Sequence, residues 1–292
     1  MFSVSTLPST EPLPLTPEGK LDYSKDFFGR QAFLTVSGQL AVENYSMGLS
    51  DVYTFGPTFR AEDSKTTRHL AEFWMIEPEL AWAGIEENME CAESYLKACI
   101  QYALDTVPDD LEFFEENYEP GLIARLHNVL AGPFSRTTYT EAVSLVQASG
   151  KEFKEKVDWG DDLKAEHERY ICEEVFKGPT IVYNYPKTLK AFYMRVNDDD
   201  RTVQAMDILV PKIGEVVGGS VREERLEKLD EMLAFKGLDP KLYWWYRELR
   251  RYGTVPHAGF GLGFERLIMM TTGLENIRDV IPYPRWPGHA EF

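Results

Sequence analysis

The stretch FRAEDSKTTRHLAEFWMIEPEL, residues Phe59–Leu80, decides how this chain of 292 residues folds. Apolar and polar residues alternate along Tyr53–Ala61, which is the pattern of a strand with one buried face. After the polar loop EDSKTTRH the alternation resumes, with Phe73, Met75 and Glu77 on one face of a second strand. Two strands joined by a short polar loop predict a β-hairpin.

The hairpin carries charged and aromatic side chains that suit a nucleotide. Arg60 lies on the polar face of the first strand beside Glu62, and Arg68 and His69 follow at the far side of the loop. A buried guanidinium requires an anion, and its fork geometry fits a phosphate. Phe73 on the second strand offers a flat ring on which a purine can stack. The alternatives are an ordinary Arg60–Glu62 ion pair and simple core packing of Phe73.

A glycine-rich stretch, GFGLGFERL at Gly259–Leu267, predicts a strand that continues into a helix. Glycine at every second position leaves one face of the strand without side chains, so a flat ligand can approach the backbone closely. Arg266 then falls in the first turn of the helix, where the helix dipole disfavours a cation, and an anionic ligand would explain it. The alternative is a closely packed glycine strand with Arg266 paired to a surface acid.

Two carboxylates are the next candidates for chemistry. Asp207 and Glu215 come from neighbouring elements, MDILV and GEVVGGS, beside bare glycines. Such a pair suits Mg²⁺ bound to phosphates, whereas two helix caps or two ion-pair partners are the simpler alternative. The hairpin and the glycine strand, in this order, point to one reaction, the formation of an acyl-adenylate from ATP and an amino acid.

The remaining sequence predicts an α+β fold, a mainly antiparallel β-sheet flanked by helices. Helical periodicity covers Gln39–Leu49 and residues 84–150, and we interpret the second range as a helical insertion. Further elements are expected as strands at AFLTVSG (32–38), TIVYNYP (180–186), KAFYMRV (190–196) and TVQAMDILVP (202–211), and as helices from Ala165 and over residues 222–237.

Composition excludes several classes of protein. The chain is 43% hydrophobic and 27% charged, as globular proteins are, and no apolar run approaches the roughly 20 residues that span a bilayer. A net charge of −17 argues against non-specific binding of nucleic acid, so an RNA partner requires a local basic patch. The three cysteines lack metal-ligand spacing and fit a reducing compartment; we expect the cytoplasm, with an organelle as the alternative. P-loop, GxGxxG, GxSxG and HExxH patterns are all absent from the sequence.

These stretches resemble the class II aminoacyl-tRNA synthetases, and within them the asparaginyl-tRNA synthetases of the bacterial and organellar type. FRAEDSKTTRHLAEFWMIEPEL is similar to the second class motif, and GFGLGFERL to the third. Other similar segments are TVSGQL, YTEAV, WGDDLKAEHERY, YPKTLKAFYMR, MDILVPKIGEVVGGSVREERL, YWWYRELRRYGTVPHAGFG and NIRDVIPYPR. The similarity extends from about Phe2 to Phe292, practically the whole chain, and the motifs are highly specific in combination.

The resemblance implies roles for the residues described above. Arg60 would bind the α-phosphate of ATP and stabilise charge during attack, and Arg266 would hold the γ-phosphate, so these two would be the catalytic residues. Asp207 and Glu215 would hold Mg²⁺ on the phosphates. The other ATP-binding residues would be Glu62, Arg68, His69, Phe73, Glu215, Gly261 and Gly263, with adenine between Phe73 and Arg266.

For the amino acid, the resemblance implies that Ser37 and Gln39 line its ammonium and carboxylate end. Glu77 and Arg222 would read the side chain, because an amide offers Glu77 a donor and Arg222 an acceptor, and His257 would be a further asparagine-binding residue. The carboxylate of aspartate would instead face Glu77, with a repulsion of roughly 4 kcal/mol at about 4 Å and an effective dielectric near 20. Aspartate-specific relatives carry a lysine shortly after the QL pair, and QLAVEN has none, which favours asparagine.

The chain departs from the family pattern in several places. It reads AED at residues 61–63, where the family usually has AEN, and Val221 where the family usually has Gln. An OB-fold that reads the anticodon, the first class motif and a mobile loop would all precede Met1. We therefore expect residues 1–292 to be an N-terminally incomplete catalytic domain of a longer synthetase, and a natural protein of 33.5 kDa would contradict this.

The resemblance implies an asparagine–tRNA ligase that uses ATP, L-asparagine and tRNA(Asn). The full-length family forms a homodimer, which is left open for this shorter chain, and no membrane partner is expected. Two alternative functions also stay open. One is a synthetase-related enzyme that makes asparagine from aspartate and ammonia, and the other is a non-catalytic paralogue. Asparagine-dependent pyrophosphate exchange, with and without tRNA, separates all three.

Overall fold

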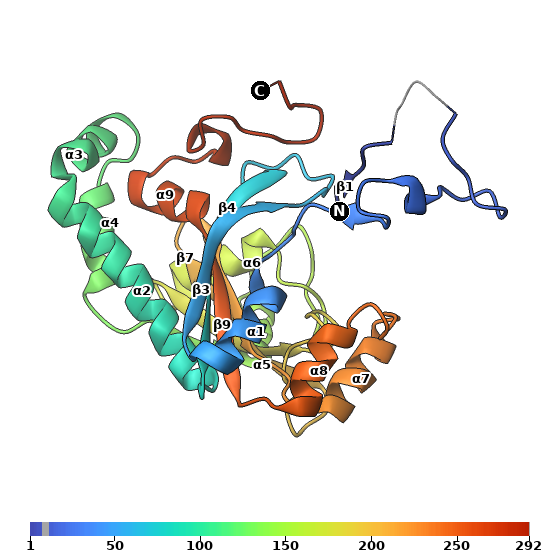
Figure 1. The fold of residues 1–292 in the computed structure, drawn as a ribbon. Helices are drawn as coiled ribbons and strands as arrows, with labels where there is room; N and C mark the ends of the chain where they lie inside the picture. Colours follow the sequence, from blue (N-terminus) through green and yellow to red (C-terminus); the bar gives the residue numbers. More distant parts are fainter. Residues whose placement is uncertain (8–11, 292) are drawn as a thin grey trace.

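The computed structural model describes residues 1–7 and 12–291 and has the expected α+β architecture (Figure 1). Its centre is a seven-stranded sheet in the order β3-β4-β9-β8-β7-β6-β5. Neighbouring strands are antiparallel except for β5 and β6, which are parallel. The strands of this sheet are β3 (Val52–Phe59), β4 (Glu72–Ala81), β5 (Ser135–Thr138), β6 (Thr180–Pro186), β7 (Thr202–Val210), β8 (Gly214–Val221) and β9 (His257–Gly263).

The predicted hairpin is confirmed, because β3 and β4 pair along their whole length with Thr58 opposite Phe73. On β3 the polar face is the buried one, while Tyr53 and Phe55 on the other face are exposed. A separate two-stranded sheet, β1 (Ser3–Val4) with β2 (Ala32–Phe33), lies in the N-terminal part, which extends away from the body in Figure 1.

Helices cover both faces of the central sheet. The long helix α2 packs against β7, β8 and β9, and α3 and α4 lie beside it (Figure 1). Helix α5 packs on β6, and α7 packs on α8. The helices are α1 (Gln39–Leu49), α2 (Ile85–Thr106), α3 (Pro108–Asn117), α4 (Leu122–Leu130), α5 (Tyr139–Ala148), α6 (Ala165–Arg169), α7 (Leu226–Phe235), α8 (Trp244–Tyr252) and α9 (Phe264–Thr272).

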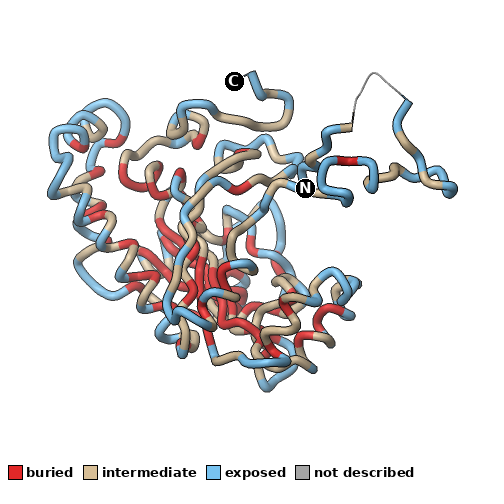
Figure 2. The backbone as a smooth tube through the Cα atoms, in the orientation of Figure 1, coloured by how far each residue is buried: buried red, intermediate tan, exposed pale blue. Residues whose placement is uncertain are grey.

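Strand alternation divides the buried side chains into two clusters, one on each face of the sheet. On β7, Met206 and Ile208 join the cluster that contains the inward residues of α2, α4 and α9. Val203 and Ala205, on the opposite face, join the cluster formed with α5 and α7. Figure 2 shows the buried residues concentrated along the central strands, with the N-terminal extension largely exposed.

Four sequence expectations differ from the structure. The expected strand at 32–38 is reduced to Ala32–Phe33, and residues 190–196 form two isolated bridges instead of a strand. The helical range 84–150 is interrupted by the short strand β5, whose partner β6 lies some 45 residues further along the chain. Helix α8 was not expected. For β5 the reason is pairing with a distant segment, which outweighs the local pattern.

The helices α2, α3 and α4 lie between β4 and β5 in the chain, and we propose that they form the inserted part of the domain. No helix in the described part of the chain has the length and apolarity needed to cross a membrane.

Candidate functional site

A cavity of about 380 Å³ opens on the face of the sheet opposite α2. Strand alternation explains its position. On β9, Phe260 and Leu262 belong to the core cluster with α2, so the glycines that alternate with them, Gly259, Gly261 and Gly263, face the other way. Fourteen of the predicted site residues line this cavity: Ser37, Gln39, Arg60, Glu62, Arg68, His69, Phe73, Glu77, Asp207, Glu215, Arg222, Gly261, Gly263 and Arg266.

The predicted bare face of β9 is only partly open to a ligand. A Cβ on Gly259 would lie 2.5 Å from Oε1 of Glu79, and one on Gly261 would lie 2.3 Å from Cε of Met75. The missing side chain at Gly259 therefore leaves space for the buried Glu79 carboxylate. This agrees with the alternative explanation of the glycines, a closely packed strand. Gly261 faces the flexible end of a methionine, which can move aside, and Gly263 lies under the Arg266 side chain.

Arg60 and Phe73 from the two strands of the hairpin lie together in one part of the cavity. The guanidinium carbon of Arg60 is 5.0 Å from the centre of the Phe73 ring, within the range of a cation–π contact. Arg60 Nη2 also lies 3.6 Å from Sδ of Met75. No carboxylate partner of Arg60 is found among the described residues, so the alternative of an ordinary Arg60–Glu62 ion pair is not observed.

Two further arginines, Arg68 and Arg266, line the cavity together with His69. Arg68 pairs with Glu168 at 3.3 Å, and its Nε is buried without a hydrogen-bond partner among the described residues. Arg266 donates through Nη1 to the carbonyl oxygen of Glu215 at 2.6 Å. Burial lowers the pKa of His69, and the nearby Arg266 lowers it further. An excess of donors with few acceptors suits an anionic ligand.

Asp207 and Glu215 converge on Gly218. A Cβ there would lie 3.1 Å from Oε1 of Glu215 and 3.4 Å from Oδ1 of Asp207, so both carboxylates approach one bare position. Lys190 donates to Oδ2 of Asp207 at 2.6 Å. Burial raises the pKa of Asp207 and the charge of Glu215 adds to the rise, whereas Lys190 opposes it.

The Asp207 and Glu215 carboxylates fit a magnesium ion that also binds phosphate oxygens. Mg²⁺ is commonly held by one or two carboxylates together with substrate oxygens and water. Oδ1 of Asp207 and the Glu215 carboxylate are not used by Lys190 and lie next to a glycine that leaves space for an ion. The raised pKa of Asp207 reflects a carboxylate that lacks full compensation, which a cation would supply.

Glu77 marks the other part of the cavity and is 4% exposed. Its carboxylate accepts hydrogen bonds from the Ser37 hydroxyl, from the Gly38 N–H at 2.8 Å and from the Thr54 hydroxyl at 3.1 Å. Gly38 is required here, because a Cβ would lie 2.6 Å from Oγ1 of Thr54. Gln39 begins α1 beside this carboxylate and donates to Glu43 at 3.1 Å.

Arg222 lines the same part of the cavity but pairs with a residue that sequence reasoning missed. Its Nε and Nη2 donate to the two oxygens of Glu79, and Nη1 donates to the Ser220 hydroxyl at 2.7 Å. Glu77 and Glu79 are two residues apart on β4 and therefore point the same way, so alternation could have identified Glu79. Other missed residues are Lys190, Tyr193, Glu43 and Glu168.

The prediction for His257 needs correction. His257 is fully buried at the start of β9 and does not line the cavity. Its Nδ1 faces the Val255 carbonyl at 2.8 Å, and its Nε2 faces Glu43 at 3.0 Å. His257 therefore belongs to a buried cluster with Glu43 and Glu79 instead of facing the cavity.

Comparison with known proteins gives consistent results. The family model described as tRNA synthetases class II (D, K and N) matches residues 12–287. An asparagine–tRNA ligase of Actinobacillus pleuropneumoniae serotype 3 (strain JL03) is 59% identical over 292 residues, 100% of this chain and 62% of that protein. The asparagine–tRNA ligase of Thermosynechococcus vestitus is 56% identical over 100% of this chain and 63% of its own length.

Among solved structures, the asparaginyl-tRNA synthetase of Pyrococcus horikoshii complexed with asparaginyl-adenylate is similar with a TM-score of 0.83. The identity is 42%, and the match covers 90% of this chain and 58% of that one. The chain thus spans less than two thirds of the length of these relatives.

Proposed function

The chain belongs to the class II tRNA synthetases of the D, K and N group, and on that premise we propose that it is an asparagine–tRNA ligase. It activates asparagine with ATP to asparaginyl-adenylate and pyrophosphate, and transfers the asparaginyl group to tRNA(Asn). One observation carries this proposal. A single cavity joins a part rich in arginine and carboxylate, suited to a magnesium nucleotide, to a smaller part lined by Glu77 and Arg222.

Arg60, Arg68 and Arg266 bind the phosphates of ATP in this proposal. Among residues 1–7 and 12–291, the buried Nε of Arg68 has no hydrogen-bond partner and Arg60 has no ion-pair partner. Both observations support the proposal, because phosphate oxygens would accept from both side chains. Adenine stacks on Phe73 in this proposal, and the guanidinium carbon of Arg60 lies 5.0 Å from the centre of the same ring.

Asp207 and Glu215 hold Mg²⁺ beside the bare Gly218. The ion, when bound, neutralises negative charge on the phosphates. Lys190 donates to Oδ2 of Asp207 and so fixes the carboxylate that, with Glu215, would hold the ion.

The asparagine carboxylate attacks the α-phosphorus, and pyrophosphate leaves in line with it. In this mechanism no residue of the chain forms a covalent bond to either substrate. Arg60 and Arg266 stabilise the charge that develops on the phosphates, and positioning of the two substrates supplies much of the rest.

Asparagine binds between Glu77 and Arg222. The side-chain amide donates to Glu77 and its carbonyl accepts from Arg222, while Ser37 and Gln39 line the ammonium and carboxylate end. Arg222 supports this role because only three of its five N–H donors are used within the described residues.

We further propose that the enzyme works in the cytoplasm. Cys91, Cys99 and Cys172 are all free thiols, which fits a reducing compartment.

Pyrophosphate exchange tests the proposed function. The purified chain is incubated with ATP, labelled pyrophosphate and one amino acid at a time, first without tRNA. Label should enter ATP with asparagine and not with aspartate, and added tRNA(Asn) should become charged. Exchange with aspartate alone would favour the asparagine-forming enzyme, and no exchange with any amino acid would favour the non-catalytic paralogue.

A further inference from the structure

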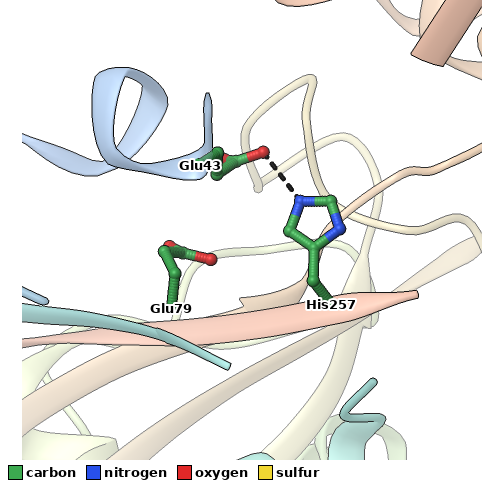
Figure 3. A group of neighbouring side chains, drawn as sticks. All are labelled: Glu43, Glu79 and His257. Atoms are coloured by element: carbon green, nitrogen blue, oxygen red, sulfur yellow. Dashed lines mark hydrogen bonds and ion pairs between the residues drawn. The ribbon is translucent and has the colours of Figure 1, made fainter. Parts of the chain in front are cut away.

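A buried cluster of ionisable side chains lies behind the amino-acid part of the cavity. Figure 3 shows Glu43 from α1, Glu79 from β4 and His257 from β9 turned toward one another. All three are fully buried. Arg222 and Arg250 complete the cluster, each paired with one of the glutamates. Nothing in the proposed chemistry uses these glutamates directly, because neither lines the cavity.

The cluster is better described as an ion-pair network than as a metal centre. The ligand atoms of Glu43, Glu79 and His257 lie within 4.8 Å of one another, a spacing that a metal ion could bridge. Two guanidinium groups already compensate the carboxylates, however, and a cation would be repelled by both. The hydrogen bonds of each carboxylate are also already made by protein donors.

Glu43 is the hub of the network. It accepts from Arg250 Nη2 at 2.8 Å, from the Tyr246 hydroxyl at 2.7 Å and from His257 Nε2 at 3.0 Å. Although burial raises the pKa of Glu43, the charges of Arg250, His257 and Arg222 lower it more, so the net shift is downward and the group stays ionised. Its Oε1 is also 3.9 Å from Nε of Arg222.

Glu79 fixes Arg222 through a two-point contact with Nε and Nη2. This geometry holds the guanidinium plane in one orientation and compensates its charge within the protein. One hydrogen remains on Nη1 and one on Nη2 for a ligand, since the Ser220 hydroxyl takes the other Nη1 hydrogen. Arg222 therefore presents hydrogen-bond donors to the cavity but little uncompensated charge.

We propose that Glu79 and Glu43 add to the preference for asparagine over aspartate by compensating the charge of Arg222. This inference rests on the proposed function and concerns the same cavity. A neutral amide carbonyl needs only the donors of Arg222 and binds well. The carboxylate of aspartate would need the full positive charge of Arg222 to offset its desolvation. Glu79 and Glu43 already compensate that charge. Both are positioning residues, because they act on the ligand through Arg222.

The test measures binding rather than turnover. Wild-type chain, Glu79→Gln and Glu43→Gln are titrated by calorimetry with two non-hydrolysable sulfamoyl analogues, one of asparaginyl-adenylate and one of aspartyl-adenylate. Glu93→Gln is the matched control, because Glu93 is a buried carboxylate paired with Lys97 away from the cavity. Thermal unfolding of each variant shows whether it is folded.

Glu79→Gln should lower the ratio of asparaginyl to aspartyl affinity by about tenfold or more, mainly by tightening the aspartyl analogue, since a charge next to Arg222 is removed. Glu43→Gln should lower it less, because its carboxylate is further from Arg222 at 3.9 Å. Glu93→Gln should leave the ratio unchanged. If Glu79 and Glu43 only stabilised the fold, replacing them would weaken the binding of both analogues equally. The ratio of the two affinities would then stay constant.

Each outcome supports or overturns a distinct claim. An unchanged ratio in a folded Glu79→Gln or Glu43→Gln chain overturns this inference while the wild type still prefers the asparaginyl analogue. A wild-type chain that binds neither analogue overturns the proposed function and this inference together. If Glu79→Gln does not fold, the milder Glu43→Gln variant decides, because it leaves the two-point contact on Arg222 intact.

Discussion

Replacing Glu77 with Gln removes one negative charge from the amino-acid part of the cavity with little change in volume. The carboxylate is 4% exposed and faces the place where the substrate side chain would bind. An aspartate carboxylate about 4 Å away would be repelled by roughly 4 kcal/mol at an effective dielectric of 20. That repulsion corresponds to about a thousandfold preference for asparagine over aspartate. Glu77→Gln should reduce this preference by up to about a thousandfold.

The substitution Glu77→Gln also disturbs the hydrogen bonds around the carboxylate. Glu77 accepts from Ser37, Gly38 and Thr54, and glutamine offers a single acceptor oxygen and two donor hydrogens in their place. Leaving one of these donors unpaired costs about 1–3 kcal/mol, so exchange with asparagine should also slow. The assay is pyrophosphate exchange at several concentrations of each amino acid, which gives kcat/KM for asparagine and for aspartate.

Ser37→Ala is the matched control, because it removes one hydrogen bond to Glu77 and keeps the charge. It should slow asparagine exchange without relaxing selectivity. The reasoning would be refuted if Glu77→Gln kept the wild-type ratio of kcat/KM, or if Ser37→Ala relaxed the ratio as much.

Three further predictions concern separate parts of the cavity. Arg266→Ala should reduce the rate of pyrophosphate exchange by about 100-fold to 1,000-fold, the range seen when one charge-stabilising donor is removed, while thermal unfolding stays close to the wild type. Gly38→Ala should lower both the melting temperature and asparagine affinity, because its Cβ would lie 2.6 Å from Oγ1 of Thr54; unchanged calorimetric binding would contradict the close approach. Burial raises the pKa of Glu79 to about 7, against the effect of Arg222, so the carboxyl gains a proton as pH falls below about 7. Arg222 then loses its compensation and aspartate should compete better at pH 6 than at pH 8, as measured by the exchange ratio at the two values.

The pH effect depends on the groups around Glu79. Glu43 adds to the rise in the pKa of Glu79, while Arg222 and His257 act against it. Because the folded pKa is above the ordinary value of 4.5, protonation of Glu79 favours the folded state. This contribution is present in full below about pH 4.5 and is lost as pH rises through about 7.

The hairpin, the glycine strand and the residues on them were predictable because their signals are local. Alternation with a period of two residues identified Phe73, Met75 and Glu77 as one face of a strand, and all three line the cavity. The predicted helix Gln39–Leu49 has the bounds that the structure shows. Each of these features depends on neighbours within a few residues of the chain, so the amino-acid sequence alone is enough to predict it.

Two of the three discrepancies in strand prediction, at residues 190–196 and at β5, have a common origin. KAFYMRV has the composition of a strand, yet residues 190–196 form only isolated bridges, because the sheet positions beside β8 are taken by β7 and β9. The four residues of β5 have no distinctive composition and become a strand by pairing in parallel with β6. Strand formation depends on a partner, and the partner is remote in sequence.

The amino-acid sequence was sufficient to predict the family and the hairpin, and all predicted site residues except His257 line the cavity. The pairing of their charges could be seen only in the folded chain. Arg222 is 143 residues from Glu79, yet the two form a fully buried ion pair, and His257 lies behind that pair instead of in the cavity. Charge compensation acts over a few ångströms in space, and the register of β4, β8 and β9 sets those distances. This register pairs residues that are far apart in the sequence, so the local periodicity of the chain does not predict it.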